Sequence, residues 1–154
     1  MSVTLGQPIP EFSAQSTVGV IDSKSFKGRY TVLYFYPKDN TSGCTMEGRD
    51  FSALYEKFKT LNAEVIGVSR DSIKSHTNFC NKQGFPFALI SDSEEELCKA
   101  FDVIKLKKLY GREYMGIERS TFVIDPEGRI RGEWRKVKVA GHAQAVLEFL
   151  ESIQ

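Results

Sequence analysis

The sequence predicts an α/β fold in which a mixed central sheet is flanked by helices. Short runs of β-branched and aromatic residues alternate with segments whose apolar residues recur every three or four positions, a pattern typical of parallel strands joined by helices. Late in the chain, two strand-like runs are separated only by a turn sequence, which adds antiparallel strands to the sheet. The length of 154 residues suits one core, so we expect a single domain over residues 1–154.

The first half of the chain supplies a hairpin, two buried strands and the helix between them. Residues 10–26 hold two short strand-like pieces, which predicts an N-terminal β-hairpin. Residues 29–37 (RYTVLYFYP) are nearly all β-branched or aromatic, as in a central strand covered on both faces. Apolar residues at helical spacing predict one amphipathic helix over 44–61, and residues 63–69 (AEVIGVS) predict a second buried strand.

The middle of the chain continues the alternation. A helix is expected from Asp71, as its N-cap, to Gly84, as its C-terminal stop. Residues 86–91 (PFALIS) predict a third strand. The segment SEEELCKAF then predicts a short helix, which Ser93 and Glu96 open in capping-box spacing.

The C-terminal part predicts a hairpin and a closing helix. Residues 119–137 form two strand-like runs around the turn 125–128 (DPEG), and residues 142–153 carry an apolar stripe at helical spacing. The complete order of elements is that of a thioredoxin-like fold with an N-terminal β-hairpin extension.

Charge and composition exclude several classes of function. The chain has 21 basic and 20 acidic side chains, so it offers no field that would attract nucleic acid or anionic lipid. The densest basic stretch, 105–112 (KLKKLYGR), is expected to be a solvated loop. We expect no membrane segment, because no stretch approaches ~18 apolar residues. The N-terminal MSVTLGQPIPEF lacks the basic and long apolar regions of a secretory signal. Three widely spaced cysteines do not form a disulfide framework, so we expect a cytoplasmic protein with reduced thiols.

Cys44 stands where the chain turns from strand to helix, within YPKDNTSGCTMEG. The first helical turn presents unpaired N–H groups and the positive end of the helix dipole to the sulfur, and both favour the nucleophilic thiolate. Pro37 ends the strand, Gly43 permits a tight entry to the helix, and Thr41 can present a hydroxyl to the same pocket. We therefore interpret Cys44 as a reactive thiol rather than a small buried apolar residue.

The motif Pro37-x-x-x-Thr41-x-x-Cys44 resembles the P-x-x-x-T-x-x-C signature of peroxiredoxins, and YFYPKDNTSGCTMEGRDF resembles the bacterioferritin comigratory protein, or peroxiredoxin Q, subfamily. The likeness extends through LGQPIPEFSA, VIGVSRDS, FPFALISD and RSTFVIDPEGRI, almost the whole chain. It implies that Cys44 is the peroxidatic cysteine, that Thr41 orients the peroxide and that Arg119 holds the thiolate and the peroxide oxygens. The permanent charge and several donors of Arg119 suit this role. Pro37 and Gly43 complete the expected substrate-binding set.

Two positions depart from the subfamily pattern. Many members have proline where Ser42 stands, and many have a second cysteine where Arg49 stands. Without that nearby thiol, the resemblance implies that Cys80, in NFCNKQG, is the resolving cysteine, although a packing role for it stays open. Cys98, in EELCKAF, is expected in the core. Cys44 and Cys80 lie on different predicted helices, whereas a disulfide needs Cα atoms within about 7 Å of each other. Formation of the disulfide is therefore expected to require local unwinding of the helix that carries Cys44.

The two histidines are not expected to bind a metal. His76 precedes Cys80 by four positions, but a zinc site needs more ligands than these, so His76 is expected at the surface. His142 is expected to cap the last helix or to contact solvent. We expect neither a metal nor an organic cofactor.

The sequence therefore predicts a thiol peroxidase that reduces hydrogen peroxide and organic hydroperoxides. A Cys44–Cys80 disulfide would be recycled by a thioredoxin-like or glutaredoxin-like reductant, and the resemblance implies a monomer. The alternatives are a one-cysteine peroxidase resolved by an external thiol, and a non-enzymatic redox sensor or chaperone. A thioredoxin-type reductase is disfavoured, because Thr41 stands where a C-x-x-C pair needs its first cysteine.

Overall fold

The computed structural model describes residues 3–154, so the first two positions of the expected domain lie outside the described residues. Within the described residues the strands are β1 (Ser13–Ser16), β2 (Gly19–Asp22), β3 (Tyr30–Phe35), β4 (Ala63–Ser69), β5 (Ala88–Ser91), β6 (Ile104–Leu109), β7 (Arg112–Ile117), β8 (Ser120–Ile124) and β9 (Ile130–Trp134). The helices are η1 (Ser23–Phe26), α1 (Ser42–Ala53), α2 (Tyr55–Thr60), α3 (Ile73–Gln83), α4 (Glu96–Ala100) and α5 (His142–Ser152). None of these helices has the length and apolarity needed to cross a membrane.

The central sheet is mixed, as the sequence predicts. Seven strands pair in the order β2-β1-β5-β4-β3-β8-β9, and β6 and β7 form a separate two-stranded sheet. β3, β4 and β5 run parallel, whereas β8 and β9 are antiparallel at one edge and the N-terminal hairpin is antiparallel at the other. The α/β class, the mixed sheet and the N-terminal hairpin extension are therefore confirmed.

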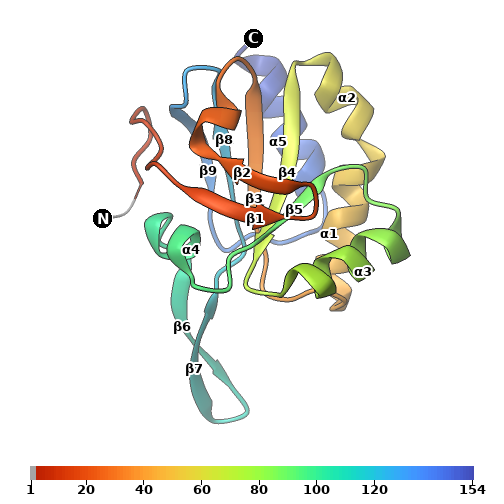
Figure 1. Cartoon of the computed structure of the whole chain (residues 1–154), viewed down its shortest axis with the longest axis vertical. Helices are drawn as coiled ribbons and strands as arrows, with labels where there is room; N and C mark the ends of the chain where they lie inside the picture. Colours follow the sequence, from red (N-terminus) through yellow and green to blue (C-terminus); the bar gives the residue numbers. More distant parts are fainter. Residues whose placement is uncertain (1–2) are drawn as a thin grey trace.

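Each face of the sheet carries its own hydrophobic core. Side chains alternate along β3, so that Val32 and Tyr34 enter one core while Leu33 and Phe35 enter the other. α1, α2, α3 and α5 cover the first face, and α4 with the N-terminal segments covers the second (Figure 1). Cys44 belongs to the first core and Cys98 to the second, so the sheet separates these two thiols.

The helix expected over 44–61 is interrupted at Leu54. There the backbone has φ −100° and ψ 2°, and the Leu54 N–H is shared between the carbonyls of Asp50 and Phe51 at 3.3 and 3.2 Å. The break divides the segment into α1 and α2, and each part buries its own phenylalanine, Phe51 and Phe58. Apolar spacing alone could not show it, because the spacing continues across the break.

Two predicted helix starts are wrong. α3 is capped by Ser72, whose hydroxyl accepts the Ser75 N–H at 3.1 Å, because the Asp71 carboxylate is already bound to the backbone of another segment. The expected capping box of Ser93 and Glu96 is absent from α4: the N-cap is Glu95, with positive φ and no side-chain cap.

The unpaired N–H groups at the start of α4 are satisfied from further upstream. The Asp92 carboxylate accepts the N–H groups of Leu97 and Cys98 at 3.1 and 2.7 Å. At the other end of α3, the predicted stop is confirmed, since Gly84 takes the left-handed conformation with φ 70°.

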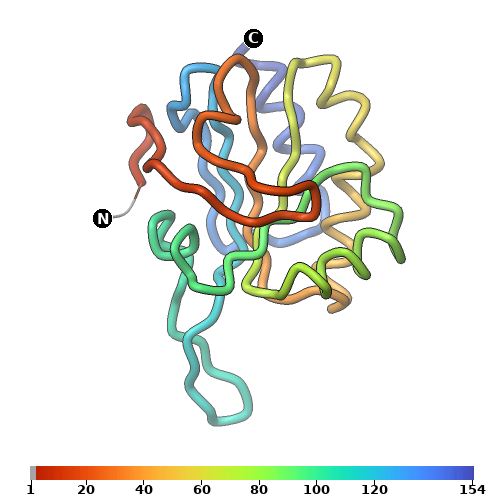
Figure 2. The backbone as a smooth tube through the Cα atoms, viewed as in Figure 1, coloured from red at the N-terminus to blue at the C-terminus, as the bar shows by residue number. Residues whose placement is uncertain are grey.

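The basic stretch 105–112 is a hairpin rather than a loop. β6 and β7 pair in antiparallel register, and Tyr110 and Gly111 at the turn have φ values of 51° and 76°, as primed two-residue turns require. Figure 2 shows this hairpin extending away from the rest of the chain. The alternation of Ile, Lys and Leu in β6 is a strand pattern that the high charge of the segment obscured.

Gly48 lets α1 approach the segment after α3, which gives a stability prediction. A Cβ at this buried position would overlap the Phe85 ring. Gly48→Ala should therefore lower the free energy of unfolding by about 1–3 kcal/mol through overpacking, although alanine raises helix propensity. Urea denaturation measures the change, and in a Phe85→Leu background the cost should shrink. A Gly48→Ala variant as stable as the parent would contradict this packing.

Candidate active site

Cys44 lies in the first turn of α1, in a nearly closed site. The residue is 2% exposed, and its sulfur accepts a hydrogen bond from Arg119 Nη2 at 3.4 Å. On sequence alone, a reactive thiol and a buried residue are alternatives, but Cys44 is buried and also contacts a cation. The guanidinium and the start of the helix both stabilise negative charge on this sulfur.

Sheet register brings Arg119 to Cys44. Ser120, the first residue of β8, pairs with Phe35, the last residue of β3, so Arg119 lies beside the loop that leads from β3 to α1. A Cβ on Gly43 would lie 3.2 Å from Arg119 Nη2. Glycine at this position therefore gives the guanidinium room to approach α1.

Glu47 is the second partner of Arg119. Nη1 of Arg119 donates to Glu47 Oε1 at 2.6 Å, and the Glu47 side chain is only 1% exposed. Burial raises the pKa of Glu47 from 4.5 to about 7, although the charge of Arg119 acts in the opposite direction. Sequence reasoning missed Glu47. Its position three residues after Cys44, on the same side of a helix, was the available signal.

The other predicted substrate-binding residues lie on the same loop. Pro37 is half-buried and lies two residues after the end of β3. Thr41 is the N-cap of α1, but it makes no side-chain cap. It is exposed, and its hydroxyl donates to the Lys38 carbonyl at 2.9 Å. The structure thus brings Cys44, Gly43 and Arg119 together, while the Thr41 hydroxyl is bonded within its own loop.

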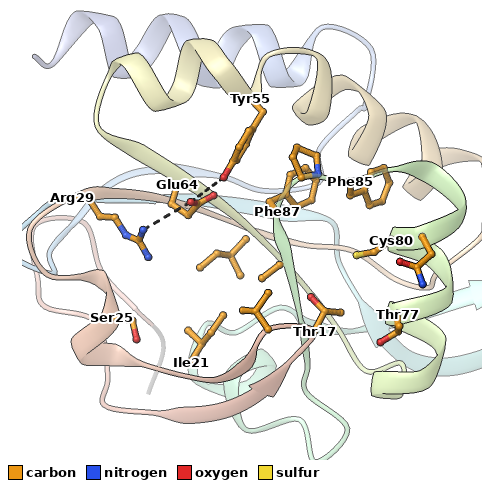
Figure 3. Close-up of a pocket in the computed structure, with 15 residues that line it drawn as sticks. Thr17, Ile21, Ser25, Arg29, Tyr55, Glu64, Thr77, Cys80, Phe85 and Phe87 are labelled. Atoms are coloured by element: carbon orange, nitrogen blue, oxygen red, sulfur yellow. Dashed lines mark hydrogen bonds and ion pairs between the residues drawn. The ribbon is translucent and has the colours of Figure 1, made fainter.

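Cys80 faces different surroundings. All three cysteines are free thiols. The half-buried Cys80 lines a cavity of about 440 Å³ together with Thr17, Phe85 and Phe87, and Cys44 is not among the lining residues (Figure 3). Burial, and then the charge of Asp39, raise the pKa of the Cys80 thiol to about 11. Cys98 is fully buried, as expected, and burial raises its pKa further still.

Both predictions about the histidines are wrong. His76 has no exposed surface, and its Nδ1 lies 2.7 Å from Asp39 Oδ2. His142 does open α5, but it is buried and its Nε2 pairs with the Thr121 hydroxyl at 2.8 Å. Burial, with a smaller effect of Arg119, lowers the pKa of His142 to about 4. Each ring is buried because a polar partner from a distant segment satisfies it.

A thioredoxin-like sheet that holds a helix-terminal cysteine against an arginine defines a thiol-based redox protein. The cation beside the buried sulfur suits such chemistry, and a second thiol, Cys80, packs against the same core.

Comparison with known proteins gives the family. Residues 5–133 match the AhpC/TSA family. Peroxiredoxin Bcp of Xanthomonas campestris is 59% identical over 129 residues, 84% of this chain and 81% of the relative. Peroxiredoxin Bcp of Bacillus subtilis is 49% identical, with 99% and 98% covered. A cysteine-to-serine mutant of Xylella fastidiosa PrxQ superposes with a TM-score of 0.94 at 46% identity, covering 99% and 98%. The chain belongs to the AhpC/TSA family, in its peroxiredoxin Bcp (PrxQ) branch.

The raised pKa of Glu47 predicts a pH-dependent stability. Between pH 4.5 and 7 the folded chain holds the Glu47 proton more tightly than the unfolded chain does, so the contribution of Glu47 to stability falls as pH rises through this window. The side chain of the Glu47→Gln variant cannot lose a proton. Over the same pH range its free energy of unfolding should therefore fall less than that of the parent, and the difference should be on the order of 2 kcal/mol. Urea denaturation of the reduced protein at pH 5 and pH 8 measures the difference. Equal pH dependence in both proteins would show that Glu47 titrates normally.

Proposed function

We propose that this protein is a thiol-dependent peroxidase in which Cys44 reduces hydrogen peroxide and organic hydroperoxides. The contact of Arg119 with the Cys44 sulfur, 3.4 Å at the start of α1, carries the proposal. The thiolate attacks one peroxide oxygen and the O–O bond breaks. The other oxygen leaves as water or an alcohol after taking a proton, and Cys44 becomes a sulfenic acid.

The surrounding residues have separate roles in this step. Arg119 keeps its charge at any working pH, so it stabilises both the thiolate and the negative charge that develops on the leaving oxygen. Gly43 allows that approach, and Pro37 lies in the loop after β3, where its ring prevents the strand from continuing toward α1. Thr41 is the exposed N-cap of α1, three residues before Cys44, and we assign its hydroxyl to orient the peroxide.

Cys80 is our assignment for the resolving cysteine. Its thiol attacks the sulfenic sulfur, water leaves, and a Cys44–Cys80 disulfide forms. Two observations support this choice over Cys98: the sheet separates Cys98 from Cys44, whereas Cys80 packs against the core that contains Cys44. Two solved structures of X. campestris Peroxiredoxin Q each have serine in place of one cysteine. The two replaced cysteines are as far apart in their sequence as Cys44 and Cys80 are in this one.

A dithiol reductant of thioredoxin-like or glutaredoxin-like type completes the proposed cycle. It supplies the two electrons that return the disulfide to two thiols, and a reducing cytoplasm keeps such a reductant in its dithiol form. We further propose that the protein works there as a monomer. Sedimentation of the reduced protein measures the oligomeric state.

Cys44→Ser should abolish turnover, because serine lacks the nucleophilic thiolate. Peroxide consumption with thioredoxin, thioredoxin reductase and NADPH measures it, and circular dichroism checks the fold. Consumption far in excess of protein by the parent chain would distinguish catalysis from a stoichiometric sensor. A Cys44→Ser variant that keeps more than a small fraction of turnover would remove Cys44 from the reaction.

Cys80→Ser should still undergo the first oxidation but stall as the sulfenic acid. Under excess peroxide it should over-oxidise to the sulfinic acid, since no thiol in the chain captures the intermediate. Mass spectrometry of Cys44 follows both forms. Cys98→Ser is the matched control and should cycle nearly normally. If Cys98→Ser stalled instead, the assignment would reverse. If neither stalled, an external thiol would resolve a one-cysteine peroxidase.

A further inference from the structure

Asp39 joins the loop before α1 to helix α3. This side chain is 2% exposed, and its carboxylate has three side-chain partners. Oδ1 accepts the Tyr36 hydroxyl at 2.6 Å, and Oδ2 accepts the Ser75 hydroxyl at 2.7 Å and pairs with His76 Nδ1 at 2.7 Å. Ser75 and His76 both belong to α3, so two of the three interactions cross from the loop to the helix.

The His76 ring in this cluster is also held by its second nitrogen. His76 Nε2 lies 2.9 Å from the Ile90 carbonyl of β5, and because a carbonyl only accepts, Nε2 carries a hydrogen. The backbone N–H of Asp39 donates to Asp71 Oδ2 at 2.9 Å. Asp39, Asp71 and His76 bring ligand atoms within 4.8 Å of one another, but these atoms are engaged in hydrogen bonds, so we assign no metal to them.

The same cluster adjoins Cys80. His76 precedes Cys80 by one helical turn, so the two side chains lie on the same side of α3. The charge of Asp39 also contributes to the raised pKa of Cys80. Cys80 faces the cavity of Figure 3 while the Cys44 sulfur contacts Arg119, so disulfide formation requires α3 or the start of α1 to move. The interactions of Asp39 hold these two segments together.

We propose that Asp39, through Tyr36, Ser75 and His76, is a latch that keeps the loop before Cys44 docked on the Cys80 helix and so controls when Cys80 captures oxidised Cys44. The inference rests on the proposed function. These side chains are positioning residues, since among the described residues the Cys44 sulfur has its hydrogen bond with Arg119 and not with them. The closed latch holds Cys44 beside Arg119 for attack on peroxide, and its opening frees Cys80 to reach the sulfenic acid.

Weakening the latch should therefore change the two chemical steps in opposite directions. Tyr36→Phe keeps the ring and removes one hydrogen bond to Asp39, and Ser75→Ala removes another. Each should speed disulfide formation after a peroxide pulse by about twofold to tenfold, the range that one lost buried hydrogen bond gives, and should slow the initial attack by a smaller factor, because most molecules remain closed. Over-oxidation of Cys44 should need more peroxide. Stopped-flow kinetics and mass spectrometry measure these quantities.

Tyr55→Phe is the matched control. It removes a hydroxyl that donates to Glu64 at 3.0 Å in the wall of the Cys80 cavity, without touching Asp39. It should leave both rates unchanged. In an Asp39→Asn background the effects of Tyr36→Phe should disappear. A variant that slowed both steps together would indicate loss of fold stability only, and would overturn the latch.

A labelling measurement separates failure of the latch from failure of the proposed function. In a Cys44→Ser background, which has no peroxidatic thiol, iodoacetamide labels Cys80, and mass spectrometry locates the label. Tyr36→Phe should raise the labelling rate about twofold to tenfold, and Tyr55→Phe should not. Because Tyr36→Phe leaves the charge of Asp39 in place, the rise would report opening of the latch and not removal of that charge. This result is expected whether or not the parent consumes peroxide. Unchanged labelling in both Tyr36→Phe and Ser75→Ala, or an equal rise in Tyr55→Phe, would overturn the proposal.

Discussion

The site depends on the contacts of one side chain: the Arg119 guanidinium hydrogen-bonds both to the Cys44 sulfur and to the Glu47 carboxylate. A buried positive charge is costly unless negative groups compensate it, and both compensating groups come from the first turns of α1. The pairing of β3 with β8 places the arginine, and Gly43 leaves the space it occupies. The sheet register and the chemistry of the thiol are therefore linked through one side chain.

The three thiols differ because their surroundings differ. Cys44 accepts a hydrogen bond from a cation, whereas burial raises the pKa values of Cys80 and Cys98. A thiol whose pKa lies well above neutral pH is a poor nucleophile toward peroxide. The fold thus gives Cys44 a cationic neighbour that favours the thiolate, and places Cys80, whose pKa burial raises, against the same core.

Local sequence patterns predicted most of the fold and part of the site. β-Branched runs located the central strands, and the turn chemistry of Asp125 and Gly128 located the last hairpin. The errors arose where long-range partners decide. His76 is buried because Asp39, 37 positions away, satisfies its ring, and no local pattern carries that information. Position 119 lies beside Cys44 only through β-sheet register, so the resemblance, and not the spacing, singled it out.

The separation of Cys98 from the other thiols by the sheet also bears on oxidative damage. A chain with three cysteines risks pairing the wrong two when oxidants are abundant. Here an incorrect bridge between Cys44 and Cys98 would have to join side chains that lie on opposite faces of the seven-stranded sheet, in separate hydrophobic cores. Misoxidation is thus opposed by the cost of removing a buried side chain from its core as well as by distance. The architecture acts as a barrier against disulfide scrambling for as long as the chain stays folded.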